Sequence, residues 1–124
     1  MSELLTTEIE NNVAVITLDD GKANALSFAM LEAINKALDD AMKHAQATVL
    51  MGRPGIMSGG FDLKVINGGN ATEINRLVEQ GARVLMRLYG YSQPLVVAAT
   101  GHAVALGAFM LLTGDYRFGT RGEF

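Results

Sequence analysis

Residues 52–66, "GRPGIMSGGFDLKVI", decide the fold of this chain, because they connect an apolar run to the start of a helix. The run before them, "ATVLM" at 47–51, has the length and residue types of a buried strand. A second stretch repeats the arrangement, since the apolar run 95–99 passes through a glycine-containing loop, 100–107, into an apolar helix over about 105–113. Strands and helices that alternate in this way predict an α/β fold with right-handed crossovers.

The other segments carry the periodicities that such a fold requires. In the first part of the chain we expect two strands within 4–19 that turn at Asn11–Asn12, then a loop over 19–27 and a helix capped by Ser27. Further along we expect a short helix within 61–66, a long helix over about 72–89 that ends at Gly90, and a strand within 115–120. The long helix has a predicted apolar face of Ile74, Leu77, Val78, Leu85 and Leu88, with Gly81 in its interior. Both alternating sets of residues in 13–18 are largely apolar, which predicts a strand covered on both faces.

Composition limits the class of protein. The chain has 124 residues, enough for one domain; 49% are hydrophobic and 19% are charged, which is typical of a globular fold. The formal net charge is −3 and no cluster of lysine or arginine is present, so we expect no nucleic-acid partner. Cysteine is absent, which excludes disulfides and thiolate metal sites and fits a cytoplasmic location. The opening residues 1–12 lack the pattern of a signal peptide.

Residues 95–114 hold no formal charge and are long enough to cross a bilayer. Gly101 and Gly107 favour a break, so we expect a strand, a turn and a buried helix there, with a membrane span as the minor alternative. His102 would then be buried in the turn, and His44 would end a helix. Histidine, aspartate and glutamate nowhere have the spacing of metal ligands, so no metal site is expected.

The two glycine-bearing loops, 52–61 and 100–107, each follow a buried strand and open a helix. A helix start exposes unpaired backbone N–H groups, and two starts directed at one point would stabilise an oxyanion. Close packing of the loops is the alternative explanation of the glycines. Neither loop has the Walker pattern or the dinucleotide-binding spacing. Lys22 and Lys64 are candidates for contacts with an anionic ligand.

Two motifs carry a family resemblance. "MSGGFDLK" (57–64) and "PLVVAATGHAVALGAFMLLTGDYRF" (94–118) resemble, in order and spacing, the diagnostic segments of the enoyl-CoA hydratase/isomerase, or crotonase, superfamily. The second motif is more similar to Δ3-Δ2-enoyl-CoA isomerases. The resemblance implies the N-terminal part of a crotonase-like ββα spiral, with parallel sheets covered by helices. It also implies that residues 1–124 are a CoA-binding core that ends before the C-terminal helices of the family.

The resemblance further implies a site for an acyl-CoA thioester. The backbone N–H groups of Phe61 and Leu106 would form its oxyanion hole, the catalytic element. The implied substrate-binding positions are Lys22, Ala23, Ala25, Gly59, Gly60, Asp62, Leu63, Lys64, Gly107 and Phe109. Coenzyme A is part of the substrate in this family, so no separate cofactor is expected.

One departure from the family pattern concerns the reaction. Hydratases of this family use two glutamates, and the first corresponds to Phe109, which cannot transfer a proton. The second would lie beyond Phe124, and Glu123 comes too early to match it. The resemblance therefore implies an isomerase that acts through a thioester enolate; the alternatives are a hydratase of fatty-acid oxidation and a catalytically incomplete CoA-binding fragment. We expect the intact protein to be an enzyme and a homo-oligomer, a trimer or a dimer of trimers, without membrane association.

Overall fold

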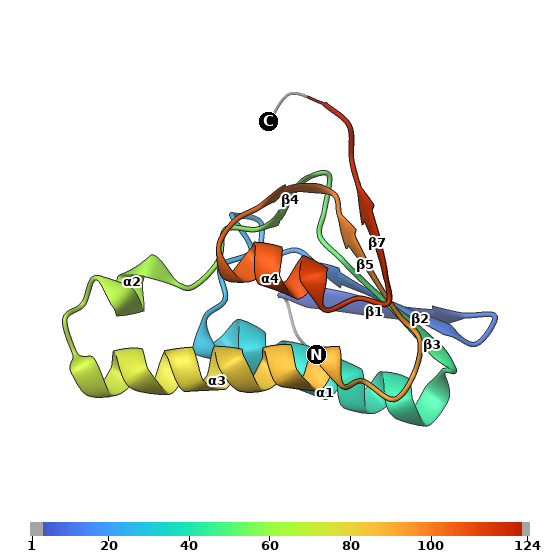
Figure 1. The fold of residues 1–124 in the computed structure, drawn as a ribbon, viewed down its shortest axis with the longest axis horizontal. Coiled ribbons are helices and arrows are strands. Elements are labelled where there is room, and N and C mark those ends of the chain that lie inside the picture. The colour runs from blue at the N-terminus through green and yellow to red at the C-terminus, as the bar shows by residue number, and fades with distance from the viewer. Residues whose placement is uncertain (1–3, 123–124) are drawn as a thin grey trace.

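The computed structural model describes residues 4–122 and has the mixed α/β architecture that the sequence predicts (Figure 1). Strands and helices alternate along most of the chain. The elements are β1 (Leu5–Glu10), β2 (Val13–Leu18), α1 (Phe28–His44), β3 (Ala47–Met51), β4 (Gly55–Ser58), α2 (Leu63–Ile66), α3 (Ala71–Tyr89), β5 (Leu95–Ala99), β6 (Gly101–Ala103), α4 (Leu106–Leu112) and β7 (Tyr116–Gly119).

Five strands form the main sheet in the order β1-β2-β3-β5-β7. The β1–β2 pair is an antiparallel hairpin, and its turn residues Asn11 and Asn12 have φ angles of 53° and 66°. Positive φ at both central residues is the conformation that matches the twist of a hairpin, and asparagine tolerates it well. The pairs β2–β3, β3–β5 and β5–β7 are all parallel, as the crossover connections require.

Helices α1 and α3 lie side by side along one side of the main sheet (Figure 1). The cap of α1 is Ser27, whose Oγ accepts a hydrogen bond from the Met30 N–H, as expected from the sequence. In α3 the buried residues are Leu77, Gly81, Val84 and Leu88. The prediction for Val78 was wrong, since this side chain is 45% exposed and the buried stripe turns toward Val84 instead.

The strand at 13–18 is covered less evenly than predicted. Ala14, Ile16 and Leu18 are fully buried against the helices, whereas the alternate residues Val13, Val15 and Thr17 are only partly buried. One face of the main sheet therefore holds the core, and the other keeps contact with solvent along this strand.

A second, two-stranded sheet lies within the two glycine-bearing loops, where the sequence indicated only loop. Strands β4 and β6 pair in parallel, and Gly55 lies opposite Gly101. This pairing requires a residue without a side chain at position 101, because a Cβ on Gly101 would lie 2.0 Å from the Gly55 carbonyl carbon. His102 lies on β6 and is exposed, so the prediction that it is buried was wrong. Within residues 4–122, no helix is long and apolar enough to cross a membrane.

Candidate functional site

The two glycine-bearing loops meet at the amino end of α4. Gly60 has a φ angle of +92°, and a Cβ on it would lie 2.9 Å from the Val104 carbonyl oxygen and 3.6 Å from the Leu106 nitrogen. Gly107 makes the reciprocal contact, since its Cβ would lie 2.6 Å from the Ser58 carbonyl oxygen. The same oxygen accepts a hydrogen bond from the Val104 N–H at 3.0 Å. The structure thus brings the predicted site residues Gly60, Leu106 and Gly107 together.

The peptide that carries the Phe61 N–H is held from one side only. The Leu26 N–H donates to the Gly60 carbonyl oxygen at 2.7 Å, and the Asp62 N–H donates to the Leu26 carbonyl oxygen at 3.2 Å. Alternate peptide groups of an extended chain point to opposite sides, so the Phe61 N–H points away from Leu26. Among the described residues, no acceptor receives a hydrogen bond from it.

The N–H of Leu106 likewise has no hydrogen-bond acceptor in the part of the chain that the structure describes. Leu106 is the first residue of α4, where an N–H has no acceptor within the helix, and none of the described residues supplies one. Its predecessor Ala105 has a φ angle of 51° and makes no side-chain cap. An alanine rarely adopts positive φ, and such strain is concentrated at functional sites. The loop contact therefore places two unpaired N–H groups, those of Phe61 and Leu106, on neighbouring segments.

A buried hydrogen-bond network fixes the loop that carries Phe61. The side-chain amide of Asn24 donates to the carbonyl oxygens of Leu18 and Met57, at 2.9 and 3.1 Å. Ser58 Oγ donates to the Asn24 carbonyl oxygen at 2.8 Å and accepts from the Gly60 N–H at 3.1 Å. Both side chains are fully buried. Sequence reasoning missed this role of Asn24, although a lone asparagine in a loop after a strand end is a signal for positive φ, here 50°.

The predicted substrate-binding residues before α1 lie against the same loop. The Gly59 N–H donates to the Ala23 carbonyl oxygen at 2.8 Å, so Gly59 and Ala23 are neighbours. Lys22 is exposed, and its carbonyl oxygen accepts a hydrogen bond from Arg53 Nη2. Ala25 is partly buried beside the paired residue Leu26. Sequence reasoning did not single out Arg53, which lies on the glycine-bearing loop itself.

Arg53 holds the loop over 19–25 by charge as well. Its Nη1 lies 3.6 Å from Asp19 Oδ1 and 3.9 Å from Asp20 Oδ1, and its side chain is 28% exposed. These distances are long for hydrogen bonds, so the contribution is mainly Coulombic and is reduced by solvent.

The remaining predicted residues flank the two N–H groups. Asp62 caps α2, and its Oδ1 accepts the Lys64 N–H at 3.0 Å. Leu63 and Lys64 project from this short helix and are exposed, which suits contact with a ligand. Phe109 lies one turn into α4 and is 56% exposed. Glu123, which comes too early in the sequence to match the second glutamate of the family, lies outside the described residues.

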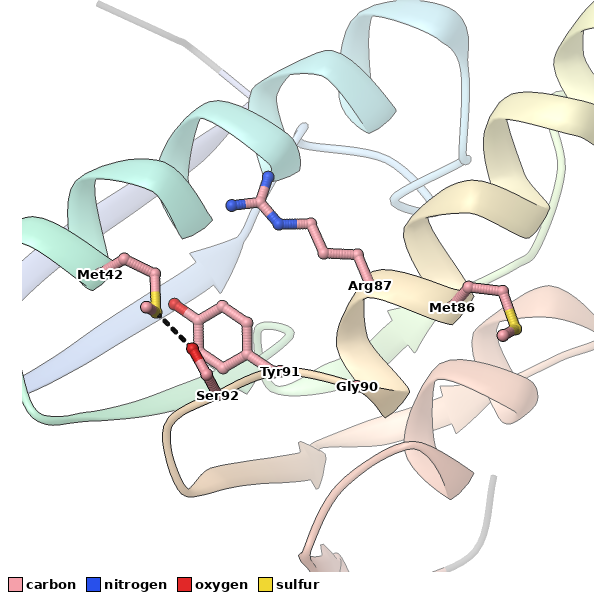
Figure 2. Close-up of a pocket in the computed structure, with 6 residues that line it drawn as sticks. All are labelled: Met42, Met86, Arg87, Gly90, Tyr91 and Ser92. Carbon is pink, nitrogen blue, oxygen red and sulfur yellow. Dashed lines mark hydrogen bonds between the residues drawn. The ribbon is translucent and has the colours of Figure 1, made fainter.

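A hollow in the surface of the protein lies away from this junction (Figure 2). It measures about 270 Å³ and lies between the carboxyl ends of α1 and α3. Its polar groups already have partners within the fold: Arg87 Nη2 binds Asp39 at 2.6 Å, and the Tyr91 hydroxyl donates to the Leu38 carbonyl oxygen at 3.1 Å. In residues 4–122 no group of three or more histidine, aspartate or glutamate side chains could hold a metal ion. The loop junction is therefore the better candidate site.

Comparison with known proteins gives the family of this chain. The enoyl-CoA hydratase/isomerase family profile matches residues 8–121. The chain belongs to the enoyl-CoA hydratase/isomerase family. It is 31% identical over 117 residues to the rat enzyme named enoyl-CoA delta isomerase 1, mitochondrial, with 92% of this chain and 40% of the relative covered. A Bacillus subtilis protein named "Probable enoyl-CoA hydratase" is 28% identical over 106 residues, with 83% of this chain and 40% of that protein covered.

A solved structure gives the same result for the fold. An enoyl-CoA hydratase/isomerase family protein from Pseudomonas syringae superimposes with a TM-score of 0.94 at 43% identity, with 98% of this chain and 53% of that chain covered. The chain thus has the fold of the family over nearly its whole length. It spans about half the length of this solved relative and 40% of the two curated relatives. Both hydratases and isomerases are among the relatives, so the family relationship alone does not distinguish the two reactions.

Proposed function

We propose that the junction of the two loops binds the thioester carbonyl of an acyl-CoA through the N–H groups of Phe61 and Leu106. The observation that supports this most is that neither N–H group has an acceptor within residues 4–122, and that the two segments that carry them are in contact at Gly60. Fixed donors need no reorganisation when the carbonyl oxygen gains negative charge, and each is worth about 3–4 kcal/mol in the transition state.

The bound carbonyl determines the chemistry that follows. Polarisation of the thioester makes the proton on its α-carbon more acidic, and the resulting enolate is stabilised by the same two donors. We propose that the intact protein uses the enolate to shift a double bond: a base takes the α-proton of a 3-enoyl-CoA and a proton is returned to the γ-carbon, which leaves the 2-enoyl-CoA. Phe109 supports isomerisation over hydration, because it lies one turn after Leu106 and carries no group that transfers a proton. The CoA arm would run along the loop of Lys22 and Ala23 toward Leu63 and Lys64.

The binding step can be tested on this chain with a Phe61→Pro variant, which removes one proposed donor while the backbone stays extended. We expect saturable binding of an acyl-CoA, measured by calorimetry, that the substitution weakens by about three- to tenfold. Ala71→Pro is the matched control, because Ala71 is the first residue of α3, where a proline is favoured, and it is not one of the proposed site residues. Equal binding by Phe61→Pro and the control would contradict the proposed donor.

The reaction can be tested on the intact protein. Conversion of a 3-enoyl-CoA to the 2-enoyl-CoA should be faster than hydration of the 2-enoyl-CoA, and faster hydration would refute the isomerase assignment. The alternative of a catalytically incomplete binding module predicts no exchange of the α-proton in deuterated water above the protein-free rate. The number of subunits, which the family resemblance predicts to be that of a trimer or a dimer of trimers, is measured in the same preparation by sedimentation.

A further inference from the structure

Helix α3 has a glycine where its buried face would otherwise carry a side chain. Gly81 lies between Leu77 and Val84 on that face, and it is fully helical. Glycine is unfavourable within a helix, so its presence at a buried position needs a reason in packing. Its φ angle is negative, and therefore backbone conformation is not that reason.

The space beside Gly81 is filled by the side chains of both proposed donor residues. A Cβ on Gly81 would lie 2.6 Å from Cε1 and 2.6 Å from Cζ of the Phe61 ring, and 3.0 Å from Cδ2 of Leu106. Carbon atoms do not approach to 2.6 Å, and a separation of 3.0 Å is unusually short, so both side chains pack against α3 at a point where it has no side chain of its own. Figure 1 shows α3 running past both α2 and α4, and it contacts both helices.

We infer that Gly81 is a positioning residue for the two N–H donors; this rests on the proposed function. The backbone at Phe61 is already held by Leu26 on one side, and the Phe61 ring resting on Gly81 holds it from another. Leu106 rests on the same glycine, so one point on α3 sets the separation of the two donor residues. A methyl group at position 81 would push the ring and the leucine away from α3 and disturb that separation.

The test measures how strongly the protein distinguishes a thioester from the same ligand without its carbonyl. The probes are an acyl-CoA and its thioether analogue, which share the CoA arm and the acyl chain. The proposed function predicts about tenfold tighter binding of the thioester. Gly81→Ala should reduce this preference at least threefold and leave the affinity for the thioether nearly unchanged, which a general loss of stability would not do. Gly119→Ala is the matched control, because a Cβ there meets nothing within 4 Å and φ is not positive.

A second-site variant identifies the contact responsible. Phe61→Leu keeps the N–H and removes the ring atoms that meet position 81, so the double variant Gly81→Ala/Phe61→Leu should regain the preference of Phe61→Leu alone. An unchanged preference in Gly81→Ala, or no recovery in the double variant, would overturn the inference. If Gly81→Ala does not fold, a folded double variant with the thioester preference supports the inference, and an unfolded one overturns it. Absence of any thioester preference in the unsubstituted protein would instead refute the proposed function.

Discussion

Asn24 connects three segments of the site, and its replacement by alanine tests how much that connection stabilises the fold. The substitution removes the side-chain donors to the carbonyl oxygens of Leu18 and Met57, both of which are in fully buried residues. It also removes the acceptor for the Asp20 N–H, which is only partly buried. A buried acceptor without a partner costs about 1–3 kcal/mol, so the two carbonyls together cost about 3 kcal/mol.

The backbone adds a further term. The φ angle of Asn24 is 50°, a conformation that asparagine tolerates and that costs alanine about 1 kcal/mol more. We therefore expect Asn24→Ala to lower the free energy of unfolding by about 4 kcal/mol, which is a large part of the stability of a small domain. Urea denaturation at 25 °C, followed by circular dichroism, measures this change.

Asn24→Asp separates the hydrogen bonds from the shape of the side chain. Aspartate has nearly the same volume and tolerates the same φ, but its carboxylate would place an oxygen against two carbonyl oxygens and bury a charge. It should destabilise the protein at neutral pH at least as much as alanine does. A loss below about 1 kcal/mol for Asn24→Ala, or near-normal stability of Asn24→Asp, would show that the two donated hydrogen bonds are not what holds this loop.

Three further substitutions test single features of the site and its supports. Gly60→Ala should destabilise the protein by about 2–4 kcal/mol, because φ is +92° and the new Cβ would meet the Val104 carbonyl oxygen; a loss under about 1 kcal/mol in urea denaturation would contradict the close contact of the loops. Ala105→Gly should raise the free energy of unfolding by about 1 kcal/mol by relieving the positive φ of 51°, and a lower midpoint of thermal unfolding would count against strain at this position. Ser27→Ala should cost about 1 kcal/mol through loss of the α1 cap, whereas Ser27→Asp should retain most of the stability, with both compared in the same assay.

Much of the fold is determined by local sequence. The hairpin at Asn11–Asn12, the cap Ser27, the end of α3 at Gly90 and the alternation of strands and helices were all predicted, because each depends on residues close together in the chain. The family resemblance was likewise carried by two short motifs and is confirmed over residues 8–121. Local patterns also identified which loops would form the candidate site.

The tertiary structure decided the features that depend on neighbours distant in sequence. The pairing of β4 with β6 joins residues 46 positions apart at Gly55 and Gly101, and neither three- to four-residue strand has a periodicity long enough to predict it. Asn24 and Arg53 each form hydrogen bonds with a loop that is distant in sequence: Asn24 donates to Met57, and Arg53 donates to Lys22. Their roles were therefore not visible as sequence motifs.

Gly81 illustrates the same limit most clearly. In the sequence it is only an unfavourable residue within a helix, and the apolar pattern around it led to the wrong assignment of Val78 to the buried face. Its role depends on the ring of Phe61 and the side chain of Leu106, which approach it from 20 and 25 positions away in the chain. The sequence by itself determined which backbone segments start helices, because capping and glycine placement are local. Only the folded chain decided the distance between the helix starts near Phe61 and at Leu106. That distance depends on side chains from a loop and from α4 that meet on α3.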